Sequence, residues 1–339
     1  MKILNLFGRY DAQLIEAAAW GNAKAVKKAL KHANPNAKKV GDLGFFAGQN
    51  APRNEDTPIM AAARNGHAEC VRILAPVSDL QTQHNTNWES ALFVAAERGY
   101  LACVQALLEC PQAHYLCKMM TLDRGDTALG IAAARGHAEC VKALLPLSIP
   151  GKLNSECRTP LCLAVSECLN PSAAMECAAL LAPDTKFPSL TDIRPTEHGK
   201  KPQIDPLAEA VAAENAEMAA LLAPLYAQRG QRDCVNPSLG LAVALMKTRQ
   251  TGPWALSGEA AHKAWALADM LAFHAEEAFA KECLADAGPA CLPRWCAHQE
   301  KIALSLIVEE GKSSQKGDLF ANAQGAFDPP ARGARSPRL

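Results

Sequence analysis

The chain has 339 residues, of which 35 are basic and 35 are acidic, so its formal net charge is zero. This balance gives no electrostatic reason for nucleic acid or an anionic membrane to be the main partner. No apolar run approaches the length of a membrane span, and the apolar stretch after Met1 is too short for a signal peptide. Because thirteen cysteines in a chain of this length favour reduced thiols, we expect a cytoplasmic protein, with delivery to a host cell by a route without a cleaved signal left open.

Apolar residues make up 49% of the chain and aromatic residues only 5%. Alanine and leucine dominate the apolar part, which favours helices with small contact residues over sheets. We therefore expect an all-α protein with a sizeable core.

One sequence pattern recurs along the first two thirds of the chain. Its copies begin at Ala12, Thr57, Ser90, Thr127, Thr159 and Asp205. The copies TPIMAAARNGHAECVRILAP and TALGIAAARGHAECVKALLP are nearly identical, whereas the copy at Thr159 carries five extra residues in its middle. Such repetition indicates a structural unit, because a catalytic motif is normally used once.

Each copy predicts a pair of helices. A Thr or Asp followed by Pro starts the first helix, which runs for about eight residues. It is expected to stop at a left-handed glycine, namely Gly21, Gly66, Gly99 or Gly136. The second helix is expected to end at a proline, namely Pro76, Pro111, Pro146, Pro183 or Pro224. Because two such short helices cannot bury their own apolar faces, the copies should stack into a solenoid.

These units resemble ankyrin repeats, with the pattern T-P-L-H-x-A-A-x-x-G-H-x-x-x-V-x-x-L-L, over about residues 10–226. The glycine of the turn before each repeat is kept only as Gly125, and Glu55, Trp88 and Cys157 stand at the equivalent positions. The resemblance implies a stack of helix pairs that binds a protein partner through its concave face and loop fingers, without catalysis. We expect a monomer without cofactors.

The C-terminal third departs from the pattern. We expect residues 1–226 to form the repeat array and residues 227–310 to form a helical cap or degenerate repeats. NPSLGLAVAL at 236–245 reads as a degenerate first helix of a seventh repeat. Residues 311–339 lack periodicity and are expected to be a disordered tail.

Cysteine and histidine are the first candidates for chemistry. Cys70, Cys103, Cys140 and Cys177 share one repeat position, which predicts packing between stacked helices, not thiol chemistry. Cys283, Cys291, Cys296 and His298 are spaced poorly for zinc. His67 and His137 follow the helix-stopping glycine, and we expect each to form a hydrogen-bonding cap for the second helix.

Binding residues are expected on one stripe. Aligned copies place Trp20, Asn65, Arg98 and Arg135 in the position before the glycine, with a parallel row at Ala19, Arg64, Glu97 and Ala134. We interpret both rows as part of the concave surface, the alternative being solvated helix ends. Trp20 is the strongest candidate because exposed aromatic residues are enriched at binding hot spots.

The loops add further candidates. The first finger is about twelve residues longer than the period requires and contains Phe45 and Phe46, which bind a partner or fold back over the N-terminal end of the core. Trp88 occupies a turn position, and residues 184–203 form another long segment.

The favoured function is therefore a protein-protein interaction scaffold or adaptor. One alternative is an enzymatic or metal-binding domain in 227–310 with the repeats as substrate adaptor. A second is a self-assembling or inhibitory module whose tail occupies the groove, and a third is a bacterial effector directed at a host.

Overall fold

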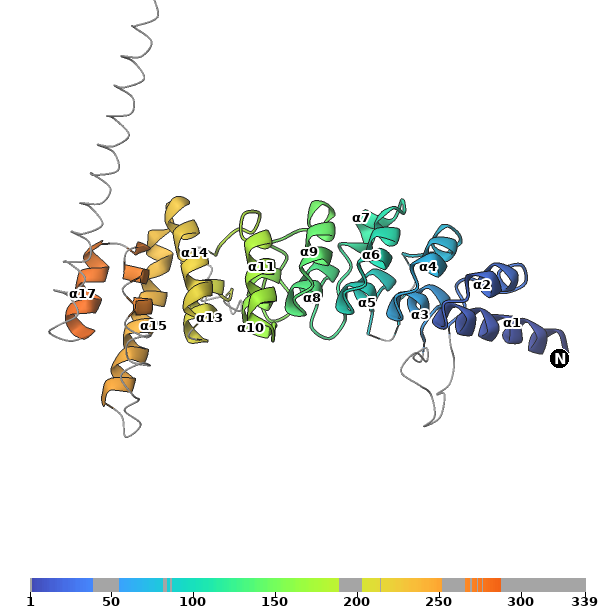
Figure 1. Ribbon diagram of the computed structural model, residues 1–339, viewed down its shortest axis with the longest axis horizontal. Coiled ribbons are helices and arrows are strands. Elements are labelled where there is room, and N and C mark those ends of the chain that lie inside the picture. Colours follow the sequence, from blue (N-terminus) through green and yellow to red (C-terminus); the bar gives the residue numbers. More distant parts are fainter. Residues whose placement is uncertain are drawn as a thin grey trace, which may run out of the picture. The chain divides into compact units, whose positions relative to one another are not determined.

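The computed structural model describes residues 2–38, 55–81, 84–85, 87–188, 203–213, 215–251, 266–268, 270–272, 274–275 and 277–287 (Figure 1). The chain divides into two compact units, residues 1–276 and residues 277–339. All regular elements within the described ranges are helices, as expected for an all-α protein.

Each of the six predicted repeats is a pair of helices. In chain order the pairs are α1 (Lys2–Ala19) with α2 (Ala23–Ala29), α3 (Pro58–Arg64) with α4 (Ala68–Leu74), α5 (Ala91–Glu97) with α6 (Leu101–Leu108), α8 (Ala128–Ala134) with α9 (Ala138–Leu144), α10 (Pro160–Glu167) with α11 (Pro171–Leu181), and α13 (Pro206–Ala212) with α14 (Ala216–Gln228). Short additions follow some second helices, namely the 3₁₀ turns Ala75–Val77 and Leu145–Leu147 and the one-turn helix α7 (Ala113–Leu116).

The pairs stack in sequence order. The first helices form one row, in which α1 packs on α3, α3 on α5, α5 on α8, α8 on α10 and α10 on α13. The second helices form a parallel row in the order α2, α4, α6, α9, α11 and α14 (Figure 1). The predicted solenoid is thereby confirmed.

Local sequence sets where the first helices begin and end. Ser90, Thr127, Thr159 and Asp205 each accept a hydrogen bond from the backbone amide three residues ahead, at 3.1–3.3 Å. Thr57 begins α3 without a side-chain capping bond. Gly21, Gly66, Gly99 and Gly136 have φ between 72° and 78°, which confirms the predicted left-handed helix ends.

The core consists of the small residues that the repeats supply. Every residue of α3 and α8 is buried. Cys70, Cys103, Cys140 and Cys177 are also buried, in the row of second helices. Their shared position is therefore a packing position, as predicted.

Three helices differ from the sequence expectation. Helix α1 has 18 residues, far longer than the expected eight. Helix α14 does not end at Pro224 but continues to Gln228, because Tyr226 is buried and donates a hydrogen bond to Asp205. Helix α15 (Arg232–Thr251) is a single 20-residue helix that packs on α13 and α14 and so continues the row of first helices. The division into array, cap and tail stays a prediction.

In the second compact unit the structure describes α17 (Glu277–Ala287).

Candidate partner-binding surface

The stripe predicted before the helix-stopping glycines lies at the ends of the first helices. Trp20 is 65% exposed, Arg98 is exposed, and the Arg135 side chain is 56% exposed. Arg135 lies 3.6 Å from Glu97 of the preceding repeat. Asn65 is half-buried and donates a hydrogen bond of 3.0 Å to the carbonyl oxygen of Ala19. Asn65 and Arg135 therefore reach towards the repeat before them.

The parallel row predicted beside this stripe, at Ala19, Arg64, Glu97 and Ala134, is largely buried. Its interpretation as exposed binding surface is therefore wrong. Arg64 is only 3% exposed, and its guanidinium donates two hydrogen bonds of 3.0 Å to Asp56. Glu89 of the next finger lies 3.6 Å away. Burial alone would lower the pKa of Arg64, but the hydrogen bond and negative charge of Asp56 outweigh it and raise that pKa. Arg64 is thus part of an internal ion pair, and Ala19 and Ala134 are buried beside the neighbouring helices.

The finger turns keep the left-handed conformation even where glycine is missing. Glu55, Trp88 and Cys157 have φ of 63°, 60° and 61°, close to the 67° of Gly125. Trp88 is 49% exposed, and its ring stacks on His84 at a centroid distance of 4.5 Å. The turn therefore presents a large aromatic side chain to solvent.

Two buried asparagines fix this turn geometry. The Asn85 side-chain oxygen accepts from the amides of Asn87 and Glu89 at 3.0 and 3.1 Å. Asn154 accepts in the same way from Glu156 and Arg158 in a later finger, at 2.9 and 3.0 Å. These asparagines were not among the residues predicted from the sequence, although each stands three positions before the left-handed residue, Trp88 or Cys157.

Neighbouring fingers are joined through their backbones. The amide of Leu122 donates to the carbonyl oxygen of Asn87 at 2.9 Å, and the amide of Ser155 donates to that of Arg124 at 2.8 Å. Leu122, which was not among the predicted binding residues, is 67% exposed. Trp88 and Leu122 therefore form an exposed apolar pair on two fingers that are held together. We call them the finger pair.

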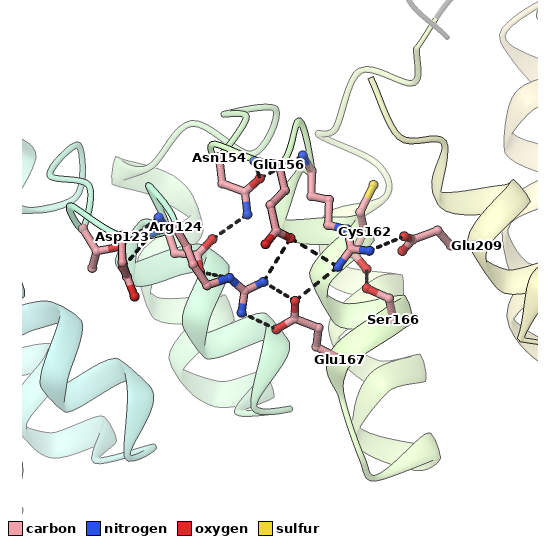
Figure 2. Close-up of polar contacts among 11 residues, drawn as sticks. Asp123, Arg124, Asn154, Glu156, Cys162, Ser166, Glu167 and Glu209 are labelled. Carbon is pink, nitrogen blue, oxygen red and sulfur yellow. Dashed lines mark hydrogen bonds and ion pairs between the residues drawn. The ribbon is translucent and has the colours of Figure 1, made fainter. Parts of the chain in front are cut away.

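A charged network links the later fingers to the first helices (Figure 2). Arg124 bonds Glu167 at the end of α10 through two nitrogens and approaches Glu156 at 3.4 Å. Arg158 reaches Glu167 at 3.3 Å and Glu209 of α13 at 3.1 Å. The hydrogen bond from Arg124 lowers the pKa of Glu167, whereas burial raises the pKa of Glu209. The network thus holds three successive repeats in register.

The two histidines bridge repeats, and the prediction that their side chains cap the second helices is wrong. Neither His67 nor His137 makes a side-chain capping bond. The Nε2 atom of His67 lies 3.0 Å from the carbonyl oxygen of Ala19, and that of His137 lies 3.1 Å from the carbonyl oxygen of Glu97. Each ring therefore satisfies a helix-terminal carbonyl of the preceding repeat.

Several predicted positions lie outside the described residues. They are Phe45, Phe46, Cys291, Cys296, His298, most of 184–203 and the tail. Within the described ranges, no cluster of three or more His, Cys, Asp and Glu side chains is arranged to hold a metal ion. The same ranges contain no helix that is long and apolar enough to cross a membrane.

A protein-family model agrees with this architecture. The family model described as "Ankyrin repeats (3 copies)" matches residues 14–119 and 112–192. A search of curated proteins gave no match. Among solved structures, the chain is similar to an ankyrin repeat domain from Acinetobacter baumannii AYE, with 23% identity, coverage of 62% of this chain and 96% of that chain, and a TM-score of 0.47. Because the family model covers more than half of the 339 residues and the helix pairs stack as such repeats do, the chain belongs to the ankyrin-repeat family.

Proposed function

We propose that the protein is an interaction scaffold or adaptor, which binds a protein partner across its fingers and the C-terminal ends of its first helices. Ankyrin repeats generally mediate protein–protein interactions, and repeat stacks present extended binding surfaces. The observation that carries the proposal is the finger pair, Trp88 and Leu122, which is exposed on adjacent fingers.

The finger pair and the arginines lie at opposite ends of the first helices. Trp88 precedes the first turn of α5, and Arg98 follows its last turn. A seven-residue helix is about 10 Å long, so the two side chains are separated by the length of one helix. Arg135 occupies the same place at the end of α8. A partner that contacts both ends of α5 would meet an aromatic ring at one end and guanidinium groups at the other, on either side of the buried residues Ala91–Ala96.

The surrounding structure supports rigid presentation of these groups. Asn85 holds the Trp88 turn through backbone hydrogen bonds, and the next finger bonds to that turn through Leu122. A preorganised surface loses little conformational entropy on binding, which favours affinity. Arg98 makes no ion pair with any described residue, so a partner carboxylate can bind it without first breaking an internal pair.

The test uses the full-length protein immobilised and exposed to lysate of its native cells. The wild type is compared with a Trp88→Ala/Arg98→Ala/Arg135→Ala variant and with a control, Lys118→Ala/Lys142→Ala, that changes exposed lysines elsewhere in the array. We expect mass spectrometry to find a protein retained by the wild type and the control and lost by the triple variant. Far-UV circular dichroism verifies that all three proteins are equally helical.

If the triple variant retains every protein that the wild type retains, the fingers and helix ends are not the binding surface. The Arg135 substitution should not unfold the stack, because its ion pair with Glu97 is exposed and such pairs contribute about 1 kcal/mol at most.

A further inference from the structure

The N-terminal end of the stack has a groove between α1 and α2, with a cavity volume of about 670 Å³. On the α1 side it is lined by Tyr10, Gln13, Ala17 and Trp20, whose spacing places them on one face of the helix. On the other side it is lined by Ala25 and Ala29 of α2 and by Lys31 and His32, which follow that helix. The groove thus has a floor of small residues with aromatic and basic edges.

This face corresponds to the surface by which the second and fourth repeats contact the repeat before them. Asn65 and Arg135 reach the preceding repeat from the position before the helix-stopping glycine. His67 reaches it from the position after that glycine. In the first repeat these two positions hold Trp20 and Asn22, and both line the groove. The first repeat therefore exposes a surface of the kind that elsewhere in the stack is covered by a helix pair.

The second helix of this repeat and its flank are strongly basic. Lys24, Lys27, Lys28 and Lys31 are exposed, and none forms an ion pair with a residue that the structure describes. Lys28 and Lys31 line the groove, and the carboxylate of Glu16 stands on the opposite side. The basic edge would attract carboxylates, whereas the alanine floor would accept small apolar side chains.

We propose that this groove is a second docking surface, which binds an amphipathic helix from another protein with a small apolar face and an acidic edge. The helix takes the place of a preceding repeat: its apolar face packs on Ala17, Ala25 and the ring of Trp20, and its carboxylates pair with Lys28 and Lys31. Trp20 is the anchor, because a 65% exposed indole loses much apolar surface to water when it is covered. A head-to-head second copy fits poorly, since it would bring two basic helices together.

The test is a selection from a displayed library of amphipathic helices about 20 residues long, in which the charges on the polar face are randomised. The bait is full-length protein carrying Trp88→Ala/Arg98→Ala/Arg135→Ala, so the surface of the proposed function cannot supply the binders. We expect the recovered helices to carry an acidic edge. A labelled representative should bind the Trp20→Ala variant and the Lys28→Glu/Lys31→Glu variant at least about tenfold more weakly than the wild type.

A matched control variant, Lys118→Glu/Lys142→Glu, makes the same change in net charge away from the groove and should bind the peptide as tightly as the wild type does. A version of the peptide with lysines on its edge should bind Lys28→Glu/Lys31→Glu better than it binds the wild type. The proposal is wrong if no helix is recovered, if the recovered helices lack an acidic edge, or if the groove variants bind them normally.

Other occupants are separate outcomes that would overturn the proposal. Sedimentation velocity that shows a wild-type dimer and a monomeric Trp20→Ala variant would identify the occupant as a second copy. Groove-dependent binding of labelled oligo(dT), or of phosphatidylserine vesicles, in place of the peptide would identify it as nucleic acid or a membrane. Loss of the finger surface affects none of these readouts, so this proposal and the proposed function fail independently.

Discussion

Three finger turns hold a residue with a Cβ atom in the left-handed region, where L-residues are disfavoured by about 1–2 kcal/mol. Glu55, Trp88 and Cys157 all have φ near 60°. At Cys157 the strain persists because the amide of Cys157 donates to the carbonyl oxygen of Asn154 and its own carbonyl accepts from Ile204. Neighbouring bonds thus fix a conformation that the residue itself opposes.

The Cys157→Gly substitution should therefore stabilise the protein. Glycine removes the left-handed strain, and its greater freedom in the unfolded chain offsets about 0.4–1 kcal/mol of that gain. We expect the free energy of unfolding to rise by up to about 1 kcal/mol. Urea denaturation followed by circular dichroism measures the change.

The matched variants separate strain from loss of the thiol. Cys157→Ala keeps the Cβ atom and should give no gain. Gly125→Ala at the equivalent turn should destabilise, because the added Cβ would lie 2.8 Å from the Ser155 hydroxyl. The prediction is wrong if Cys157→Gly leaves the free energy of unfolding unchanged or lowers it, while Gly125→Ala does not lower it. The left-handed conformation of the turn would then not destabilise the native state.

At the scale of the helix pair, the contact between one repeat's glycine and the next repeat's histidine joins neighbours. A Cβ atom added at Gly21 would lie 2.5 Å from the His67 ring, and one added at Gly99 would lie 2.6 Å from the His137 ring. The glycine is thus required twice, by its positive φ and by the ring packed against it. The histidine gains a backbone acceptor in the preceding repeat in return.

A double-mutant cycle can separate these two requirements. We expect Gly99→Ala to lower the free energy of unfolding more than Gly230→Ala does. Gly230 has a similar φ of 73°, but nothing lies within 4 Å of a Cβ atom added there. His137→Ala alone loses one hydrogen bond, worth about 0.5–1.5 kcal/mol. The Gly99→Ala/His137→Ala double variant should be less destabilised than the sum of the single variants, since the steric conflict is gone. If the loss of unfolding free energy in the double variant equals the sum of the losses in the single variants, the His137 ring moves aside freely. Thermal or urea unfolding measures these losses.

At the scale of the whole molecule, sequence periodicity predicted the stack because each repeat carries its own start and stop signals. It located the helix ends at the four glycines and the turn positions at Glu55, Trp88 and Cys157. It did not predict contacts between repeats, since these depend on which side chains stacking brings together. Arg64 appeared exposed by alignment with its row, but stacking buries it against Asp56 and Glu89.

Long-range contacts explain the other differences as well. The end of α14 lies beyond Pro224 because Tyr226 packs on Phe187 and bonds Asp205, and Arg229 bonds backbone carbonyls at the end of the preceding repeat. The groove between α1 and α2 was not predicted, because an alignment of the repeats does not show which face of a repeat stays uncovered. The available signal was the segment 21–33, which carries four lysines and no acidic residue.

The row of buried cysteines offers a measure of how the stack opens. Burial is the main cause that raises the pKa of the Cys103 and Cys140 thiols to about 11 and that of Cys177 to about 12. At pH 8 a thiol with a pKa near 11 is ionised in about one molecule in a thousand, and the thiolate is the reactive form. We therefore expect N-ethylmaleimide to modify Cys157 and Cys168, which are partly exposed, well before it modifies these three.

Digestion and mass spectrometry after timed labelling give the rate for each cysteine. In native buffer the buried thiols should react only through opening of the stack, so their rates should rise together as urea approaches the unfolding midpoint. Cys103 lies in the third of the six repeats and Cys177 in the fifth. Cys103 should be protected at least as well as Cys177, because opening of a repeat array begins most readily near its ends. Equal rates for Cys103 and Cys157 in native buffer would mean that the central repeats are not closed on one another.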